Sequence, residues 1–259
     1  MYLKKGLTEG RFVDGVGTYN DVRSLLAMDQ GTESLVFNPD THEFHWREIP
    51  QQVAEFQKQN LHFDITVDEE GNWNGTYSEV ANGLSGMMIR KLDHVTDQKE
   101  YLRRKLRNIS YPIYIEPLTF ERDQDLLKAA QIKAKIKATK RALKIGKSFY
   151  DQIIPVSQLD LFDLNNRKTD YNGYLKHKVQ LTVEVHRKRS FKKLNLPTTF
   201  EFNHKCLHVS FQPQRISDGY KYESNWVFKC TDIEVKTYKE LHEIHRQVKD
   251  KIRQAITYQ

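Results

Sequence analysis

The chain has 259 residues, which is enough to bury a hydrophobic core as one large domain or two small ones. Aromatic residues make up 11% of it, which argues against general disorder, and no apolar run approaches the ~18–20 residues of a membrane-spanning helix. The net charge of +7 is unevenly distributed: residues 126–193 hold 17 Lys or Arg against 5 Asp or Glu, and residues 1–125 hold 14 against 21. This asymmetry indicates a polyanionic ligand or an acidic protein partner, and no membrane partner is expected.

The first part of the chain is predicted to be rich in β-hairpins. Residues 33–49 read as two short strands around a turn at residues 38–41, and residues 61–80 as two longer strands around a "DEEGN" turn. A helix is predicted at residues 97–108. Residues 109–120 contain two prolines, which remove donors from a strand ladder, so this segment is predicted to be an edge strand or an extended linker.

Residues 121–150 are predicted to form one long basic helix. They open with the acidic stretch "ERDQD", which suits the positive end of a helix dipole, and continue with the strong helix formers of "LLKAAQIKAKIKATKRALKI". Gly146 is the expected end of this helix. From residue 126 to residue 150 there are eight Lys or Arg and no Asp or Glu, so a basic surface is expected around most of the helix.

The last part of the chain is predicted to form strands, which alternate with turn residues between residues 177 and 235. A terminal helix follows, with Thr237 and Glu240 in the pattern of a capping box. Its apolar stripe is expected to pack on the sheet. The stripe consists of Tyr238, Leu241, Ile244, Val248, Ile252 and Ile256.

The predicted fold class is therefore α+β. It consists of a hairpin-rich N-terminal part (1–120), a long basic connecting helix (121–150) and a C-terminal antiparallel sheet covered by the terminal helix (151–259). One continuous domain is the alternative to this division.

The basic middle of the chain is the first candidate binding site. Lys and Arg contact phosphates with little dependence on base sequence, and aromatic side chains stack on unpaired bases. The candidate nucleic-acid-binding residues are Lys133, Lys135, Lys137, Lys140, Arg141, Lys144, Lys147, Arg187, Lys188, Arg189, Lys192 and Lys193, with Phe149, Tyr150, Tyr171, Tyr174 and Phe191 nearby. This pattern predicts a nucleic-acid-binding protein, with DNA favoured over RNA. The alternative is a lysine-rich helix face that only contacts solvent.

A second candidate site lies where the last predicted strand ends. Alternation along that strand places Asp232, Glu234 and Lys236 on one face, and Asp218 begins the run that precedes it. This arrangement resembles that of the PD-(D/E)xK nucleases, and the resemblance extends from residue 218 to residue 236. It implies a Mg²⁺ ion held by Asp218 and Glu234, with Lys236 helping to activate the attacking water. The alternative is the solvated end of an ordinary strand.

Two cysteines, Cys206 and Cys230, lie in predicted strands and lack the spacing of metal ligands. Two buried thiols in a reducing cytosol are expected, and a disulfide between adjacent strands is the alternative.

The first 15 residues contain two lysines but no apolar stretch, so no signal peptide is expected and the predicted location is cytoplasmic. No cofactor is expected, apart from Mg²⁺ if the chain is a nuclease.

A third hypothesis is a structural or assembly protein, or an inhibitor of an enzyme. In this case the basic middle contacts an acidic protein surface, which can belong to a second copy of this chain, since residues 1–125 carry a net charge of −7. A homo-oligomer is one form of this hypothesis. The lysine- and asparagine-rich composition, without a strong catalytic motif, suits a protein encoded by a phage or a mobile element.

Overall fold

The computed structural model describes residues 2–3, 11–12, 24–25, 29–38, 40–92, 102, 113–115, 119–121, 126–154, 168–171, 175–187, 193–252, 254 and 256–259. Most of the regular structure in these residues is β-strand. Neither described helix is long and apolar enough to cross a membrane.

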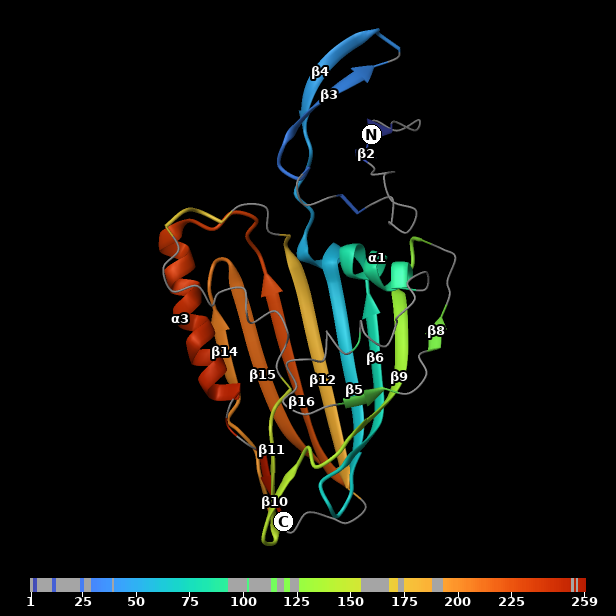
Figure 1. The fold of residues 1–259 in the computed structure, drawn as a ribbon. Helices are drawn as coiled ribbons and strands as arrows, with labels where there is room; N and C mark the ends of the chain where they lie inside the picture. The colour runs from blue at the N-terminus through green and yellow to red at the C-terminus, as the bar shows by residue number, and fades with distance from the viewer. Residues whose placement is uncertain are drawn as a thin grey trace.

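One large mixed sheet forms the body of the molecule (Figure 1). The strands lie in the order β14-β15-β16-β12-β5-β6-β9, and the short strands β7 and β8 both pair with β9 at the edge. Neighbouring strands are antiparallel, except for β5 and β12, which run parallel at the centre. The strands are β5 (Lys58–Val67), β6 (Trp73–Ala81), β7 (Ile113–Ile115), β8 (Thr119–Glu121), β9 (Ala130–Ala138), β12 (His177–Arg187), β14 (Phe200–Asn203), β15 (Leu207–Ile216) and β16 (Gly219–Phe228).

The two faces of this sheet differ in character. One face belongs to the hydrophobic core: Phe63, Val183 and Tyr222 are cross-strand neighbours on β5, β12 and β16, and all three are buried. The residues between them point to the opposite face, where His62 and Thr182 are only half-buried. We call this second side, which carries mainly polar side chains, the polar face.

The core face is covered by a smaller sheet and by helices. The smaller sheet has the order β10 (Leu143–Ile145), β11 (Ser148–Asp151), β17 (Ile256–Tyr258) and β13 (Leu194–Asn195). Helices α1 (Gly83–Leu92) and α3 (Val235–Ile252) contribute side chains to the same core cluster as β11 and β17, and the 3-10 helix η1 (Ala54–Gln57) leads into β5. The strands β1 (Tyr2–Leu3) and β2 (Arg11–Phe12) pair with each other.

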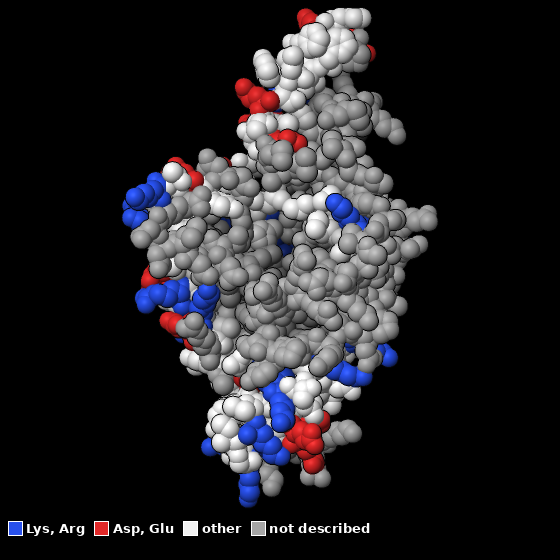
Figure 2. All heavy atoms as spheres, viewed as in Figure 1, with Lys and Arg blue, Asp and Glu red and all other residues white. Residues whose placement is uncertain are grey.

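A hairpin near the N-terminus projects beyond the end of the large sheet (Figure 1). It consists of β3 (Glu33–Asn38) and β4 (Glu43–Glu48), which pair with each other in antiparallel register. We call residues 33–48 the arm. In the space-filling view the arm is a narrow extension whose visible atoms are mostly uncharged, with several acidic side chains along it (Figure 2).

The predicted fold class is wrong in its central element, because residues 121–150 do not form a long basic helix. The described part of this segment contains strands β8, β9, β10 and β11. In β9, Ile132, Ala134 and Ile136 are buried, whereas Lys133, Lys135 and Lys137 between them are exposed. This strict period of two is the pattern of a half-buried strand. Pairing with β6 outweighs the high helix propensity of Ala and Lys, because propensity is only a weak constraint on a folded chain. The molecule is therefore mainly β rather than α+β.

Other predicted elements are confirmed. The hairpins at residues 33–49 and 61–80 are β3–β4 and β5–β6, and the predicted edge strand corresponds to β7 and β8 on the outer side of β9. The strand predictions at the C-terminal end correspond to β12, β14, β15 and β16. The helix predicted at residues 97–108 lies outside the described residues, apart from the buried Leu102. Strands from all three predicted parts of the chain lie in the same large sheet.

The terminal helix is confirmed, but its cap is not the predicted one. Helix α3 begins at Val235, so Thr237 lies inside it and is buried. The backbone N–H of Val235 donates to Asp170 Oδ1 at 3.0 Å, so a carboxylate from a distant loop caps the positive helix end. Tyr238, Leu241 and Val248 form the buried stripe as predicted, whereas Ile256 lies beyond the helix, in β17.

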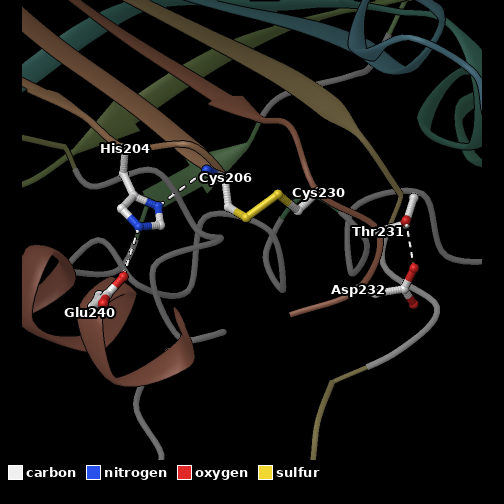
Figure 3. Close-up of a disulfide and its surroundings, with 6 residues drawn as sticks. All are labelled: His204, Cys206, Cys230, Thr231, Asp232 and Glu240. Atoms are coloured by element: carbon white, nitrogen blue, oxygen red, sulfur yellow. Dashed lines mark hydrogen bonds and ion pairs between the residues drawn. A yellow bond between two sulfur atoms is a disulfide. The ribbon is translucent and has the colours of Figure 1, made fainter. Parts of the chain in front are cut away.

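The two cysteines form a disulfide, which corrects the prediction of two free thiols (Figure 3). Cys206 and Cys230 lie just beyond the paired ends of β15 and β16, with their Cα atoms 4.9 Å apart. Nδ1 of His204 accepts a hydrogen bond from the backbone N–H of Cys206 at 3.1 Å, so the ring proton is on Nε2. Nε2 donates a hydrogen bond to the carboxylate of Glu240 in α3, also at 3.1 Å. The disulfide end of the sheet is thereby connected to the terminal helix.

Candidate interaction surfaces

The predicted nuclease residues do not meet in one place. Asp218 lies in the turn before β16, Glu234 lies after that strand, and Lys236 is in the first turn of α3. The ten residues of β16 span about 30 Å, whereas ligands of one Mg²⁺ ion must each come within ~2.1 Å of it. Because β16 ends at Phe228, the alternation expected to continue to Lys236 stops earlier. Across the part of the chain that the structure describes, no group of three or more His, Cys, Asp or Glu can hold a metal ion.

Asp218 lies just before β16, at the end of the strand remote from Glu234 and Lys236, and it contacts a histidine there. Its Oδ2 lies 3.0 Å from Nδ1 of His186, and Nε2 of the same ring lies 3.6 Å from Asp64 on β5. The hydrogen bond from His186 holds the pKa of Asp218 below its ordinary value. Asp218 thus connects the β15–β16 turn to β12.

Arg141, one of the predicted phosphate-binding residues, lies inside the protein. It is 2% exposed, and its guanidinium lies 3.4 Å from the carboxylate of Asp151, which is 1% exposed. It also donates to the carbonyl oxygen of Gln152 at 3.0 Å, and Tyr220 donates to the second oxygen of Asp151 at 2.7 Å. Burial raises the pKa of Asp151, and the nearby guanidinium opposes this shift. Arg141 is therefore part of a buried ion pair, and no phosphate can reach it in this structure.

Two further predicted phosphate-binding residues, Lys144 and Arg187, make contacts with other parts of the protein. Lys144 donates to the backbone carbonyl of Glu69 at 2.9 Å, and the guanidinium of Arg187 lies 4.6 Å from the ring centre of Phe149. Phe149 is buried and stacks on Tyr258, so it does not offer a free ring to a base. Lys188, Arg189, Lys192, Tyr174 and Phe191 lie outside the described residues.

The remaining predicted lysines are on the surface. Lys133, Lys135 and Lys137 form a row along β9 on the polar face, and alternation spaces them about 7 Å apart. We call these three side chains the lysine row. Among the other predicted lysines that the structure describes, Lys140, Lys144, Lys147 and Lys193 are also exposed. The structure therefore separates the predicted basic surface into several parts.

The arm carries an apolar surface that the sequence analysis did not single out. Leu35 lies opposite Trp46 and Phe37 lies opposite Phe44, so all four side chains share one face of the hairpin. They are 47–65% exposed, and the rings of Phe37 and Phe44 are 5.0 Å apart. Val36, on the other face, is buried. The arm thus turns its larger apolar side chains toward solvent.

A second exposed apolar surface lies on the β10–β11 hairpin, which we call the tip (residues 143–151). Leu143 lies opposite Tyr150, and Ile145 shares their face; these three side chains are 38–56% exposed. The tip packs beside the β5–β6 turn, where Gly71 has a φ of 85° and a Cβ would lie 2.0 Å from the carbonyl oxygen of Ala142. This contact places the tip at the end of β5 remote from the arm, as Figure 1 shows.

Comparison with protein-family models, curated proteins and solved structures finds no match for this chain.

Proposed function

We propose that this chain is a structural or assembly protein that binds a protein partner through the arm. The supporting observation is the exposed apolar face formed by Leu35, Phe37, Phe44 and Trp46 on a projecting hairpin. Large contiguous apolar surfaces of this kind are rare on monomers and typical of interaction sites. A two-stranded hairpin is also only marginally stable by itself, so packing against a partner stabilises it.

The charges around this face indicate the chemistry of the partner. Glu33 and Glu48 are directly opposite each other at the base of the hairpin, on the same face as the four apolar side chains, whereas Glu43 lies near the turn on the other face. Like charges in direct opposition destabilise a strand pair until a cation approaches them. The favoured partner is therefore a protein surface with apolar side chains and nearby Lys or Arg. An anionic lipid surface repels the same glutamates, which disfavours a membrane.

The disulfide bears on the location of this function. Disulfides persist in oxidising surroundings, which include secreted proteins and the surfaces of virions, and are rare in a reducing cytosol. We therefore propose that the chain acts outside the reducing cytosol, in place of the cytoplasmic location expected from the sequence. A component of a phage particle satisfies both this condition and the proposed assembly role.

A photo-crosslinking experiment tests the role of the arm. A photoreactive phenylalanine analogue at position 46, in the full chain in its source cells or particles, is expected to form a covalent adduct with one protein. The same analogue at position 135, on the polar face, serves as the matched control and is expected to form no such adduct. Adding Phe44→Ser is expected to remove the adduct at position 46, because a central aromatic contact contributes ~2 kcal/mol or more, or about 30-fold in affinity.

The purified partner is then expected to protect Trp46 from a quencher. Trp73 and Trp226 are buried, so acrylamide quenching of the free chain reports mainly on Trp46. Protection of its fluorescence by the identified protein supports the proposal. Adducts with lipid, equal adducts at positions 46 and 135, or no adduct at all would each contradict it.

Nucleic-acid binding is a second candidate function, and the lysine row favours it. Three lysines repeat along one strand on the polar face, and a row of this spacing can contact successive phosphates of a backbone. The aromatic residues Phe149 and Tyr171 are not beside this row, since Phe149 is in the core and Tyr171 pairs with Ile233. This candidate therefore relies on phosphate contacts rather than on stacking.

Filter binding tests this second candidate. We expect the wild-type chain to retain single- or double-stranded DNA, or RNA, at about 50 mM salt and to release it at about 300 mM. The triple variant Lys133→Gln, Lys135→Gln, Lys137→Gln is expected to lose retention, whereas Lys193→Gln is the matched control with unchanged retention. Absence of retention at low salt for all three nucleic acids would exclude the candidate.

A further inference from the structure

The arm and the tip are chemically complementary. Both are projecting hairpins that expose large apolar side chains on one face: Phe44 and Trp46 on the arm, and Leu143 and Ile145 on the tip. Apolar faces of this kind gain free energy when they leave water together. Their flanking charges differ in sign.

The charge difference follows from the two sequence segments. Residues 33–48 contain four Asp or Glu against one Arg, and residues 139–150 contain four Lys or Arg and no Asp or Glu. Of the four basic residues, Arg141 is buried and Lys144 is bound to the backbone of the neighbouring β5–β6 turn, whose residues 68–70 are acidic. Lys144 and Lys147 in the tip and Lys140 just before it are exposed and supply its positive charge, and both charge signs are visible around the tip in Figure 2.

One copy of the chain cannot bring its own arm and tip together. The arm leads through η1 into the first residue of β5, Lys58, whereas the tip lies beside the turn that follows the last residue, Val67. A strand of ten residues is about 30 Å long, so the two surfaces lie at opposite ends of the large sheet (Figure 1). A contact between them therefore requires two copies.

We propose that the arm of one copy docks on the tip of the next, so that the chain assembles head to tail. This inference rests on the proposed function and identifies the partner of the arm as a second copy of the chain. The docked surface joins Phe44 and Trp46 to Leu143 and Ile145, and Glu33 and Glu48, which share the apolar face of the arm, lie near Lys140 and Lys147. Such a heterologous contact leaves one arm and one tip unoccupied at the two ends of an assembly, so it produces rings or filaments. Symmetric packing of two arms would instead bring the acidic residues of both arms together.

Two variants test the contact in the full chain. The arm variant carries Phe44→Ser and Trp46→Ser, and the tip variant carries Leu143→Ser and Ile145→Ser; all four positions are exposed, and circular dichroism checks that both variants remain folded. In sedimentation velocity, the wild-type chain is expected to form larger species as its concentration rises. Each variant alone is expected to stay monomeric, with association weakened by about 30-fold or more.

Mixing the two variants gives the decisive result. The arm variant retains an intact tip and the tip variant retains an intact arm, so an equimolar mixture is expected to form dimers that do not grow further.

Charge reversal provides a second test in a chain whose apolar side chains are unchanged. Lys147→Glu is expected to weaken association, and Glu48→Lys on the other copy is expected to restore it, because Glu48 shares the face of Phe44 and Trp46. Lys135→Glu on the polar face leaves association unchanged.

The other outcomes overturn the inference in distinguishable ways. If the tip variant associates like the wild-type chain while the arm variant does not, two arms bind each other; the head-to-tail contact is then wrong and the proposed function stands. If the wild-type chain stays monomeric while the crosslinker at position 46 captures another protein, the inference fails and the proposed function again stands. If the wild-type chain stays monomeric and no adduct forms, both fail.

Discussion

Replacing Arg141 with methionine is expected to lower the free energy of unfolding by about 3–5 kcal/mol, because the Asp151 carboxylate then remains buried without its cation. Methionine keeps an unbranched apolar stem beside Trp73, whose ring centre lies 4.8 Å from the Arg141 guanidinium carbon. The hydrogen bond from Tyr220 to Asp151 remains, but it does not replace the lost charge. Urea-induced unfolding, followed by the fluorescence of the buried tryptophans, measures the change.

A surface substitution and a double substitution give this prediction its controls. Lys135→Met, in an exposed position of β9, is expected to change the stability by no more than about 0.5 kcal/mol. Arg141→Met combined with Asp151→Leu is expected to recover most of the loss, since apolar residues of similar volume often replace a buried ion pair at little cost. A typical surface substitution changes the free energy of unfolding by less than about 1 kcal/mol. If Arg141→Met alone changes it by no more than this, the assigned ion pair is contradicted.

Removing the disulfide is expected to lower the free energy of unfolding by about 3 kcal/mol. Cys206 and Cys230 close a loop with a sequence separation of 24, and the chain-entropy relation gives a stabilisation of about 3.5 kcal/mol for a loop of this size. The variant Cys206→Ala, Cys230→Ala removes the cross-link while keeping small apolar side chains at both positions. Its unfolding transition in guanidinium chloride, compared with that of the oxidised wild type, measures the effect.

Treatment with a reducing agent provides the matched comparison. The reduced wild type is expected to unfold at the same denaturant concentration as the double alanine variant, and the variant itself is expected to show no response to the reducing agent. A wild type whose transition does not change on complete reduction would show that the cross-link contributes nothing to stability.

The strands with a clear period of two could be predicted from the sequence. Residues 61–67 and 177–186 alternate apolar residues with polar ones, so both the secondary structure and the buried face follow from the pattern. Strand β9 has the same alternation, but its alanines and lysines also suit a helix. Propensity is a weak preference that strand pairing outweighs, so the periodicity was the better guide to this segment.

The disulfide could have been predicted from the turn between β15 and β16. A two-residue turn at residues 217–218 sets the register of the β15–β16 hairpin, which pairs Leu207 with Phe228. This register places Cys206 beside Lys229, whose N–H donates to the Cys206 carbonyl at 2.9 Å, and Cys230 is the next residue. Identifying that turn would therefore have favoured the disulfide over two separate thiols.

Burial of a charge and exposure of an apolar face could not be predicted in the same way. Arg141 resembles its basic neighbours in the sequence, and its partner Asp151 follows ten residues later, across the tip hairpin. Charged residues are seldom fully buried unless they are paired, so the pair becomes apparent only in three dimensions. In the arm, alternation assigns Phe44 and Trp46 to one face, but which face lies against the body depends on how the hairpin leaves the sheet.

The parallel pairing of β5 with β12 also determines the order in which the chain can fold. The ion pair between Glu55 and Lys178 beside these strands joins residues that are 123 positions apart in sequence. Strands β6 and β9 can pair soon after synthesis, but the other edge of β5 stays open until β12 has left the ribosome. Closing so long a loop is slow, and an unpaired apolar strand edge is a template for aggregation. The interval before β12 arrives is therefore the period in which a newly made chain depends most on chaperones.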